Sequence, residues 1–257
     1  MDLKKAARTA QTYAAPLLEV KTWGQRNLRK MRRTPSDPDY RAFEHIPVKS
    51  GYQFLDIGAN RGQTIASFRL YHPQIPIVAF EPNLAFVRQL TSQFIHDGAV
   101  TVHPFGLGNE SGHFNLYIPY YRGFMFDGLA SFDWDAAHDW INSTTIYGFN
   151  ARHLKIERVE CEVRPWDEVE TFPGLVKIDV QGFEASVLEG GLQTIRNYRP
   201  VLLLENSTDH RPEEILAAEG YRRACYRNGL MEIGQPGDRN TFYLPEEAAE
   251  TIAVAFR

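Results

Sequence analysis

The chain has 257 residues, of which 43% are hydrophobic and 23% are charged, and its formal net charge at pH 7 is −4. These values are typical of a globular protein and fit one large α/β domain with added segments. No apolar run approaches the roughly eighteen residues of a membrane-spanning helix, and the N-terminus lacks the apolar core of a secretory signal. Cys161 and Cys225 make no disulfide framework, and no Cys/His cluster has zinc-ligand spacing. We therefore expect a cytoplasmic protein.

Positive charge is concentrated at the N-terminus, where nine Lys/Arg residues against two acidic ones give residues 1–33 a net charge of +7. Apolar residues recur there at helical spacing, which predicts one or two amphipathic helices. Such an arm can contact an anionic membrane surface or mediate self-association. A helix docked on its own protein, with a solvated basic face, is the interpretation that we prefer. Residues 34–38 are rich in Pro, so residues 1–39 are expected to be an extension and linker before a domain at 40–257.

The rest of the chain carries −11, which excludes nucleic acid as a substrate because its phosphates would be repelled. Its first informative segment begins with an apolar strand at 54–57, which carries Asp56 near its carboxyl end. The turn Gly58-Ala59-Asn60-Arg61-Gly62 follows, and a helix is expected from Gln63 to about residue 71. A buried strand, a glycine-bearing turn and a helix start form the ligand-binding corner of a doubly wound α/β sheet. Glycine permits positive φ angles and the close approach of a ligand.

A second strand is expected at 75–80 and ends in Glu81-Pro82-Asn83. A carboxylate at the tip of this strand suits the two hydroxyls of a ribose, because it can accept hydrogen bonds from both. The turn lacks the three-glycine pattern of dinucleotide sites. An Asp-x-Gly-x-x-x-Gly turn followed by an acidic strand end resembles the S-adenosylmethionine site of class I methyltransferases.

A helix at 83–94, a strand at 100–105 and an extra strand at 113–118 are expected next. Residues 119–155 are irregular and rich in aromatic residues. This insertion is either a lid or substrate wall, since rings stack on sugar faces, or a packed subdomain whose rings are buried. A further strand is expected at 158–163.

A buried strand at 175–180 carries Lys177 and Asp179, and the strand at 200–204 is followed by Glu205. An unpaired charge inside a central strand is costly, so the two side chains either form an ion pair or belong to a site. Four carboxylates are thus expected at one edge of the sheet: Asp56, Glu81, Asp179 and Glu205. This edge suits a cationic sulfonium cofactor better than a polyphosphate. A helix at 212–219, strands at 221–226 and 239–244 and a closing hairpin complete the expected elements.

Together these motifs resemble the FkbM family of S-adenosylmethionine-dependent methyltransferases. The likeness spans about residues 50–206 and includes Lys177-Ile-Asp-Val-Gln-Gly-Phe-Glu184 and Leu188-Glu-Gly190. It implies a class I methyltransferase (Rossmann-like) fold: a doubly wound, mostly parallel seven-stranded sheet with helices on both faces. It also implies O-methylation of a hydroxyl on a sugar, glycan or natural product. Gln181 departs from the pattern, because the family usually has Glu there.

The placement of the motifs and the resemblance predict the site. The expected cofactor-binding residues are Asp56, Gly58, Ala59, Asn60, Gly62, Glu81, Pro82, Asn83, Phe105, Gly106 and Asp179. Asp179 is the first candidate for the base that takes the acceptor's proton, with Glu184 and His103 as weaker candidates. A divalent metal could instead activate the hydroxyl, although nothing in the spacing requires one.

Two other classes of function stay open. One is a nicotinamide-dependent oxidoreductase or epimerase, against which the missing third glycine and the absence of a Tyr-x-x-x-Lys pair count. The other is a non-catalytic module that keeps the cofactor fold for assembly through its basic helix.

Overall fold

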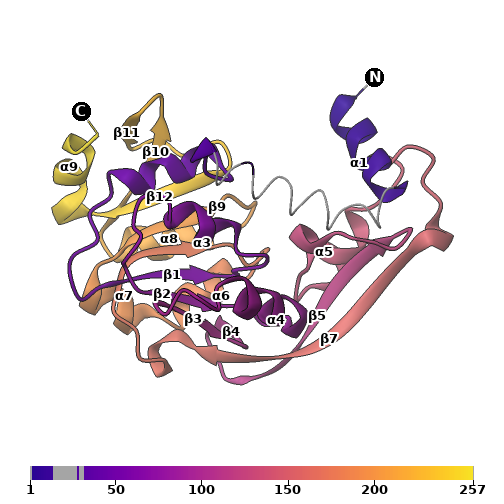
Figure 1. The fold of residues 1–257 in the computed structure, drawn as a ribbon, viewed down its shortest axis with the longest axis horizontal. Helices are drawn as coiled ribbons and strands as arrows, with labels where there is room; N and C mark the ends of the chain where they lie inside the picture. The colour runs from indigo at the N-terminus through magenta and orange to yellow at the C-terminus, as the bar shows by residue number, and fades with distance from the viewer. Residues whose placement is uncertain (1, 14–27, 29–31, 257) are drawn as a thin grey trace. The chain divides into compact units, whose positions relative to one another are not determined.

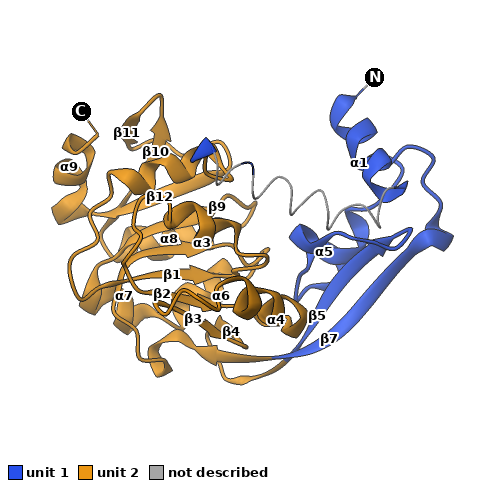
Figure 2. Ribbon diagram, in the orientation of Figure 1, with its two compact units in different colours: residues 1–33, 114–161 blue, residues 34–113, 162–257 orange. Residues whose placement is uncertain are grey.

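The computed structural model describes residues 2–13, 28 and 32–256, and the chain divides into two compact units (Figure 2). Unit 1 consists of Met1–Arg33 and Phe114–Cys161, and unit 2 consists of Thr34–His113 and Glu162–Arg257. None of the described helices is long and apolar enough to cross a membrane.

The main sheet of unit 2 has, among the described residues, eight strands in the order β11-β10-β12-β9-β8-β1-β2-β3 (Figure 1). Their bounds are β1 Gln53–Ile57, β2 Ile77–Phe80, β3 Val100–His103, β8 Pro173–Ile178, β9 Val201–Glu205, β10 Tyr221–Arg227, β11 Leu230–Ile233 and β12 Asn240–Pro245. Five neighbouring strands pair in parallel: β9, β8, β1, β2 and β3. The other three, β12, β10 and β11, pair antiparallel to their neighbours.

The sheet therefore differs from the expected mostly parallel seven-stranded sheet: it is mixed, and it has an eighth strand. The extra strand is β11. It follows a turn made by Asn228 and Gly229, whose φ angles are 53° and 84°. Two consecutive residues with positive φ form a two-residue hairpin turn whose twist matches that of the flanking strands. The chain consequently folds back at this point and adds β11 to the edge.

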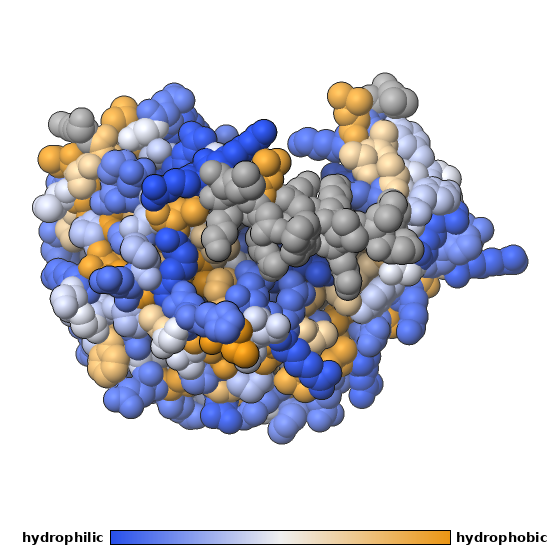
Figure 3. Space-filling view, in the orientation of Figure 1, coloured by the Kyte–Doolittle hydropathy of each residue, from blue (hydrophilic) through white to orange (hydrophobic). Residues whose placement is uncertain are grey.

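Helices lie on both faces of this sheet, as expected for a doubly wound α/β fold. They are α3 Gln63–Phe68, α4 Leu84–Gln93, α6 Glu184–Glu189, α7 Leu192–Tyr198, α8 Arg211–Ala218 and α9 Glu246–Val254, with the 3-10 helices η2 Pro38–Glu44 and η5 Trp166–Glu168. Side chains alternate between the faces of a strand, so Leu202 and Leu203 of β9 belong to different hydrophobic clusters. The first cluster includes Phe68 of α3, and the second includes Val187 of α6. On the side of unit 2 seen in Figure 3, hydrophobic residues form small patches between hydrophilic ones.

A second, four-stranded sheet has the order β4-β7-β5-β6 in the described part of the chain. Its strands are β4 Gly106–Gly108, β5 Gly112–Tyr121, β6 Phe124–Met125 and β7 Leu154–Pro165. β5 and β7 are longer than the sequence predicts. Each of these two strands has residues in both units, so the two ends of the insertion are regular strands.

Unit 1 has its own hydrophobic cluster. The helices of unit 1 are α1 Leu3–Tyr13, η3 Asp127–Leu129, α5 Trp134–Asp139 and η4 Ala151–His153, among the described residues. Tyr121, Phe126, Ile141 and Ile146 are buried together. Part of the aromatic insertion is therefore a packed subdomain, and its predicted role as a lid or substrate wall stays a prediction.

Helix α1 docks on the insertion within unit 1. The Thr9 hydroxyl accepts a hydrogen bond from the Tyr147 backbone N–H at 2.9 Å, and the Arg8 guanidinium lies 4.9 Å from the Trp140 ring centre. Lys5 donates to the Ser143 carbonyl at 2.7 Å. Basic residues of the arm thus make contacts inside their own unit. The continuation of the predicted helices beyond residue 13 lies outside the described residues.

Candidate functional site

The site is built where parallel strands of unit 2 end. Asp56 lies in β1, Glu81 follows β2, Asp179 follows β8, and Glu205 ends β9. In the register of the sheet, Asp56 is opposite Lys177, and Ile178 is opposite Leu204. The carboxyl ends of adjacent parallel strands lie at one edge, so the four predicted carboxyl groups share that edge.

Glu81 connects the turn after β1 with the start of α4. Its Oε2 accepts a hydrogen bond from the Asn60 backbone N–H at 2.7 Å, and its Oε1 accepts one from the Asn83 N–H at 2.8 Å. Asn83 in turn caps α4, because its Oδ1 accepts from the Ala85 N–H at 3.0 Å. Each carboxylate oxygen has two lone pairs, so Glu81 keeps the capacity to accept hydroxyl donors while it holds the turn. This second role was not predicted.

The two glycines of the turn are required by contacts within the protein. Gly58 has a φ of 81°, and a Cβ there would lie 2.0 Å from the Asp179 carbonyl oxygen. Gly62 has a φ of 76°, and a Cβ there would lie 2.8 Å from Leu90 of α4. Both positions need glycine for backbone conformation, as the sequence predicted, and also for packing; the predicted close approach of a ligand stays a prediction.

Asp56 is fully buried, and among the described residues neither of its carboxylate oxygens has a hydrogen-bond partner. Burial raises the pKa of Asp56 to about 7, although the nearby Lys177 charge acts in the opposite direction. Asn60 Oδ1 is also buried without a partner. Buried acceptors of this kind are normally satisfied by water or a ligand, so the turn has unmet capacity for hydrogen-bond donors.

Lys177, Asp179, Gln181 and Glu205 form one connected cluster. The buried Lys177 ammonium donates to Asp179 Oδ2 at 2.6 Å, which is the ion pair that the sequence raised as one alternative. The Gln181 amide donates to Asp179 Oδ1 at 2.8 Å and to Glu205 Oε2 at 2.5 Å. Gln181 can reach both because its backbone is left-handed, with a φ of 53°. The sequence showed only that Gln181 lacks the charge of the Glu that is usual in the family. It did not show that the Gln181 amide joins two carboxyl groups.

The charges of this cluster shift the pKa values in opposite directions. For Asp179, burial opposes ionisation, but the Lys177 ammonium together with the hydrogen bonds to the carboxylate outweighs it, so the pKa lies below its usual range. For Glu205, burial and the neighbouring Asp179 charge together raise the pKa. For Lys177, burial alone would lower the pKa, but the neighbouring groups Asp179, Tyr40 and Asp56 together outweigh burial and raise the pKa. Of the two carboxyl groups in the cluster, Asp179 therefore favours the ionised form, and Glu205 is the more readily protonated.

Two further residues belong to the same buried region. The Tyr40 hydroxyl, from η2, accepts a hydrogen bond from the Thr64 hydroxyl at 3.3 Å. Burial raises the pKa of Tyr40, and the charges of Lys177, Asp179 and Asp56 also act on it. No motif in the sequence indicated this, because Tyr40 is brought to the sheet by the segment that precedes β1.

The two weaker candidates for the base make other contacts. Glu184 is buried, and its carboxylate accepts hydrogen bonds from the Val180 N–H at 3.1 Å and the Gly182 N–H at 3.1 Å. It therefore shapes the loop before α6. His103 stacks on Phe80, with ring centres 5.1 Å apart, and burial lowers its pKa. His103 is thus packed against an aromatic side chain and partly buried.

Phe105 and Gly106, which are expected to bind the cofactor, lie next to Pro82. A Cβ on Gly106 would be 3.7 Å from the Pro82 side chain, so the two segments are in close contact. Phe105 lies next to His103 at 5.2 Å between ring centres, and the Arg164 guanidinium covers its ring at 4.3 Å. Ala59 is buried within the turn.

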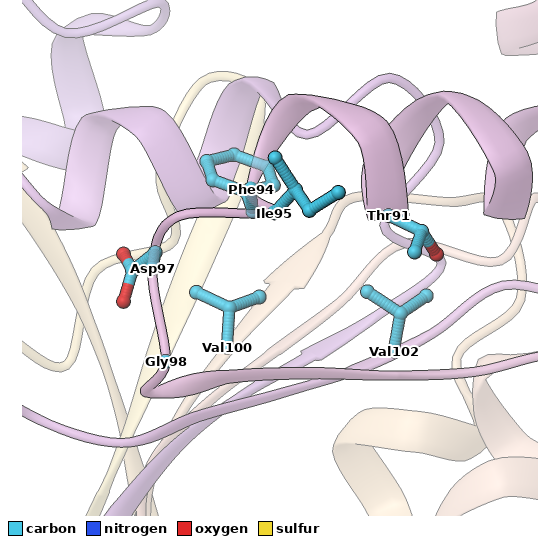
Figure 4. A pocket seen from close by; sticks show the side chains of 7 residues that line it. All are labelled: Thr91, Phe94, Ile95, Asp97, Gly98, Val100 and Val102. Carbon is cyan, nitrogen blue, oxygen red and sulfur yellow. The ribbon is translucent and has the colours of Figure 1, made fainter.

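A hollow of about 310 Å³ lies elsewhere, between the end of α4 and the edge strand β3 (Figure 4). Figure 4 shows Phe94 and Ile95 on one side and Val100 and Val102 on the other. Its walls also include Thr91 and Asp97, but no candidate residue lines it. Within the described residues, no group of three or more His, Cys, Asp or Glu side chains is placed to hold a metal ion.

Comparisons with known proteins place the chain in a family. Residues 56–225 match the family model described as the Methyltransferase FkbM domain. A comparison with curated proteins finds no match. Among solved structures, the chain resembles methyltransferase FkbM from Methylobacillus flagellatus KT, with 16% identity, 78% of this chain and 47% of that chain covered, and a TM-score of 0.48.

Two other solved structures are similar at a TM-score of 0.40. One is a precorrin-6y C5,15-methyltransferase from Geobacter metallireducens GS-15, with 14% identity; the match covers 79% of this chain and 83% of that chain. The other is a SAM-dependent O-methyltransferase from Thermotoga maritima, with 11% identity; the match covers 84% of this chain and 68% of that chain. The chain spans 47% of the length of the Methylobacillus protein. The family model covers more than half of the chain, from Asp56 in β1 to Cys225 in β10, and the chain therefore belongs to the FkbM methyltransferase domain family.

Proposed function

We propose that this protein is an S-adenosylmethionine-dependent methyltransferase that methylates a hydroxyl group of a sugar, a glycan or another natural product. Family membership supports methyl transfer in general. The observation that carries the cofactor assignment is the gathering of carboxyl groups at the ends of β1, β2, β8 and β9. The cation among them, Lys177, is buried and already paired with Asp179. This edge therefore has capacity for a cationic ligand and would repel a polyphosphate.

The residues present fit such a cofactor. The partnerless oxygens of Asp56 and Asn60 would accept from the donors of its amino acid portion, with water between them where the oxygens are enclosed. Glu81 would hold the ribose hydroxyls, and the Phe105–Gly106 segment would flank the adenine. When bound, S-adenosylmethionine supplies an electrophilic methyl group on a sulfonium centre. The protein's task is then to bind and orient both reactants, exclude water and remove the proton of the acceptor hydroxyl.

The first experiment measures ligand binding by calorimetry with S-adenosylmethionine, S-adenosylhomocysteine and NAD. We expect the first two to bind and NAD not to bind. Glu81→Gln keeps one acceptor for the backbone N–H groups but removes the charge, so its affinity for both adenosyl ligands should fall about tenfold or more. Thermal unfolding of this variant separates a binding effect from loss of the turn. Unchanged affinity would contradict the ribose assignment, and tight NAD binding would favour the oxidoreductase.

A second experiment tests catalysis. S-adenosylmethionine with a labelled methyl group is incubated with a panel of methyl glycosides, oligosaccharides and small alcohols, and transfer of the label is measured. Label in a hydroxyl-bearing acceptor supports the proposal. Cofactor binding without transfer to any member of the panel would favour a non-catalytic binding module.

A further inference from the structure

Most carboxyl groups where the parallel strands end are either fully enclosed or hydrogen-bonded within the protein. Both oxygens of Asp56 are enclosed, and both oxygens of Glu81 hold backbone N–H groups. Glu184 likewise holds N–H groups of its own loop. Asp179 has Lys177 on one oxygen and Gln181 on the other. Hydrogen bonds and a cation that stabilise the ionised form make a carboxylate a weak base, so Asp179 is poorly suited to take a proton from a hydroxyl.

Glu205 differs from these four groups. It ends β9, is partly exposed, and receives the Gln181 amide on Oε2. Asp179 and Lys177 are the charged groups that act on it from the side of β8. On the side of β12 its register partner is Asn240, a neutral residue whose amide donates to Asp39 of η2 at 2.8 Å.

We propose that Glu205 is the catalytic residue that receives the proton of the acceptor hydroxyl, and that Gln181 positions it beside Asp179. We further propose that Glu205 holds a proton in the ligand-free protein and releases it when the sulfonium donor binds. This inference rests on the proposed function. A carboxyl so close to Asp179 favours its neutral form, and burial acts in the same direction, so the pKa of Glu205 lies above its usual range. A positive charge at this edge reverses the balance and leaves Glu205 as a carboxylate.

The proposed reaction is balanced as follows. The acceptor oxygen forms a bond to the methyl carbon, and the bond from that carbon to sulfur breaks with its electron pair remaining on sulfur. Glu205 takes the hydroxyl proton as the bond forms. The neutral S-adenosylhomocysteine leaves, and Glu205 is again in the protonated state of the free protein. Binding of the next cationic donor expels this proton to solvent.

The test compares S-adenosylmethionine with S-adenosylhomocysteine, which lacks the positive charge. Calorimetric titrations at pH 7 in phosphate and in Tris give the number of protons released on binding, because the two buffers have different heats of ionisation. For the unmodified chain we expect proton release with S-adenosylmethionine to exceed that with S-adenosylhomocysteine by up to one proton, since any release from Asp56 is common to both ligands. Glu205→Gln should remove this difference. Glu214→Gln, which alters an exposed carboxyl on α8, should keep it.

Carbon-13 NMR of glutamate carboxyl groups in the ligand-free protein gives an independent readout. The signal absent from Glu205→Gln identifies Glu205, and we expect it to titrate well above the range of an exposed glutamate. Gln181→Met removes the amide that stabilises the ionised form and should move this titration to higher pH. A merely structural role of Gln181 would leave the titration of Glu205 unchanged.

The possible outcomes are distinct. Equal proton release with the two ligands, or a difference between them that persists in Glu205→Gln, would overturn the proposal and leave the proposed function intact. Ordinary titration of Glu205 in the free protein would overturn it as well. Failure of both adenosyl ligands to bind would overturn the proposed function and the catalytic role together.

Discussion

Asp56 shows how one buried residue makes the stability of the protein depend on pH. Its pKa of about 7 in the folded chain lies above the ordinary value of 3.8. Between these values the folded protein keeps a proton that the unfolded chain has lost, so the contribution of Asp56 to the free energy of unfolding is greatest below pH 4 and falls as the pH rises towards 7. The slope for one group is at most about 1.4 kcal/mol per pH unit, and it vanishes above the folded pKa.

Asp56→Asn cannot ionise and should lack this dependence. We expect the free energy of unfolding of the unmodified chain to fall relative to that of Asp56→Asn between pH 5 and pH 7, and the difference to level off by pH 8. Urea denaturation at each pH measures it. Asp238→Asn, at a position whose side chain is 91% exposed, serves as the control. Parallel stability curves for Asp56→Asn and the unmodified chain would show that Asp56 is ionised throughout.

Individual residues were predictable where a strand ends in a charged side chain. Asp56, Glu81, Asp179 and Glu205 could be placed at one edge from the strand pattern alone, because parallel strands align their carboxyl ends. Their hydrogen bonds could not be predicted. Whether Glu81 faces a ligand or the Asn60 N–H depends on how the turn folds back over β2. The bridge made by Gln181 likewise depends on one left-handed backbone angle.

At the scale of elements, the turn between β1 and α3 is fixed by its contact with the end of β8. The Gly58 position combines a positive φ with a Cβ direction that points at the Asp179 carbonyl oxygen, 2.0 Å away. Gly229, in the β10–β11 hairpin, has a similar φ of 84° but no atom within 4 Å of its Cβ position. A comparison of substitutions at these two glycines therefore separates the cost of backbone strain from the cost of steric overlap.

Gly229→Ala should lower the free energy of unfolding by about 1 kcal/mol, which is the cost of a positive φ in a residue with a side chain. Gly58→Ala should cost at least about 2 kcal/mol more, because β8 or the turn must move away. Denaturant unfolding of both variants tests this comparison. Equal decreases in the free energy of unfolding would mean that the Asp179 backbone can move away from the added Cβ at little energetic cost. In that case the turn is not fixed by β8.

Most elements of unit 2 follow from local patterns, and the exceptions have physical causes. β1, β2, β8 and β9 are short apolar runs bounded by turn residues, so they were predicted within a few residues. β11 was missed although Asn228-Gly229 is a strong hairpin signal, because its strand has only four residues. α9 was missed because its apolar face, with Ala249 and Ile252, becomes evident only when it packs on the sheet.

The whole molecule consists of two units that differ in what the sequence reveals. Unit 2 repeats a pattern of strand and helix, so its fold class was predictable. Unit 1 joins two distant segments, the N-terminal arm and the insertion. Their association depends on contacts such as Tyr147 with Thr9, which no periodicity encodes. The predicted boundary near residue 39 treats the arm alone, whereas the compact units group it with residues 114–161.

Cofactor binding should be a property of unit 2, because every candidate cofactor residue belongs to it. Hydrogen–deuterium exchange with saturating S-adenosylhomocysteine tests this at the scale of the chain. We expect slower exchange in peptides that cover residues 54–62, 79–83 and 177–182, since a ligand that engages Glu81 and the turn stabilises their backbone hydrogen bonds. Peptides that cover α5 of unit 1 should exchange as they do without ligand. Protection confined to α5 and its neighbours would contradict the site. Equal protection in both units would mean that the insertion takes part in cofactor binding itself, so its predicted role could no longer be limited to the acceptor.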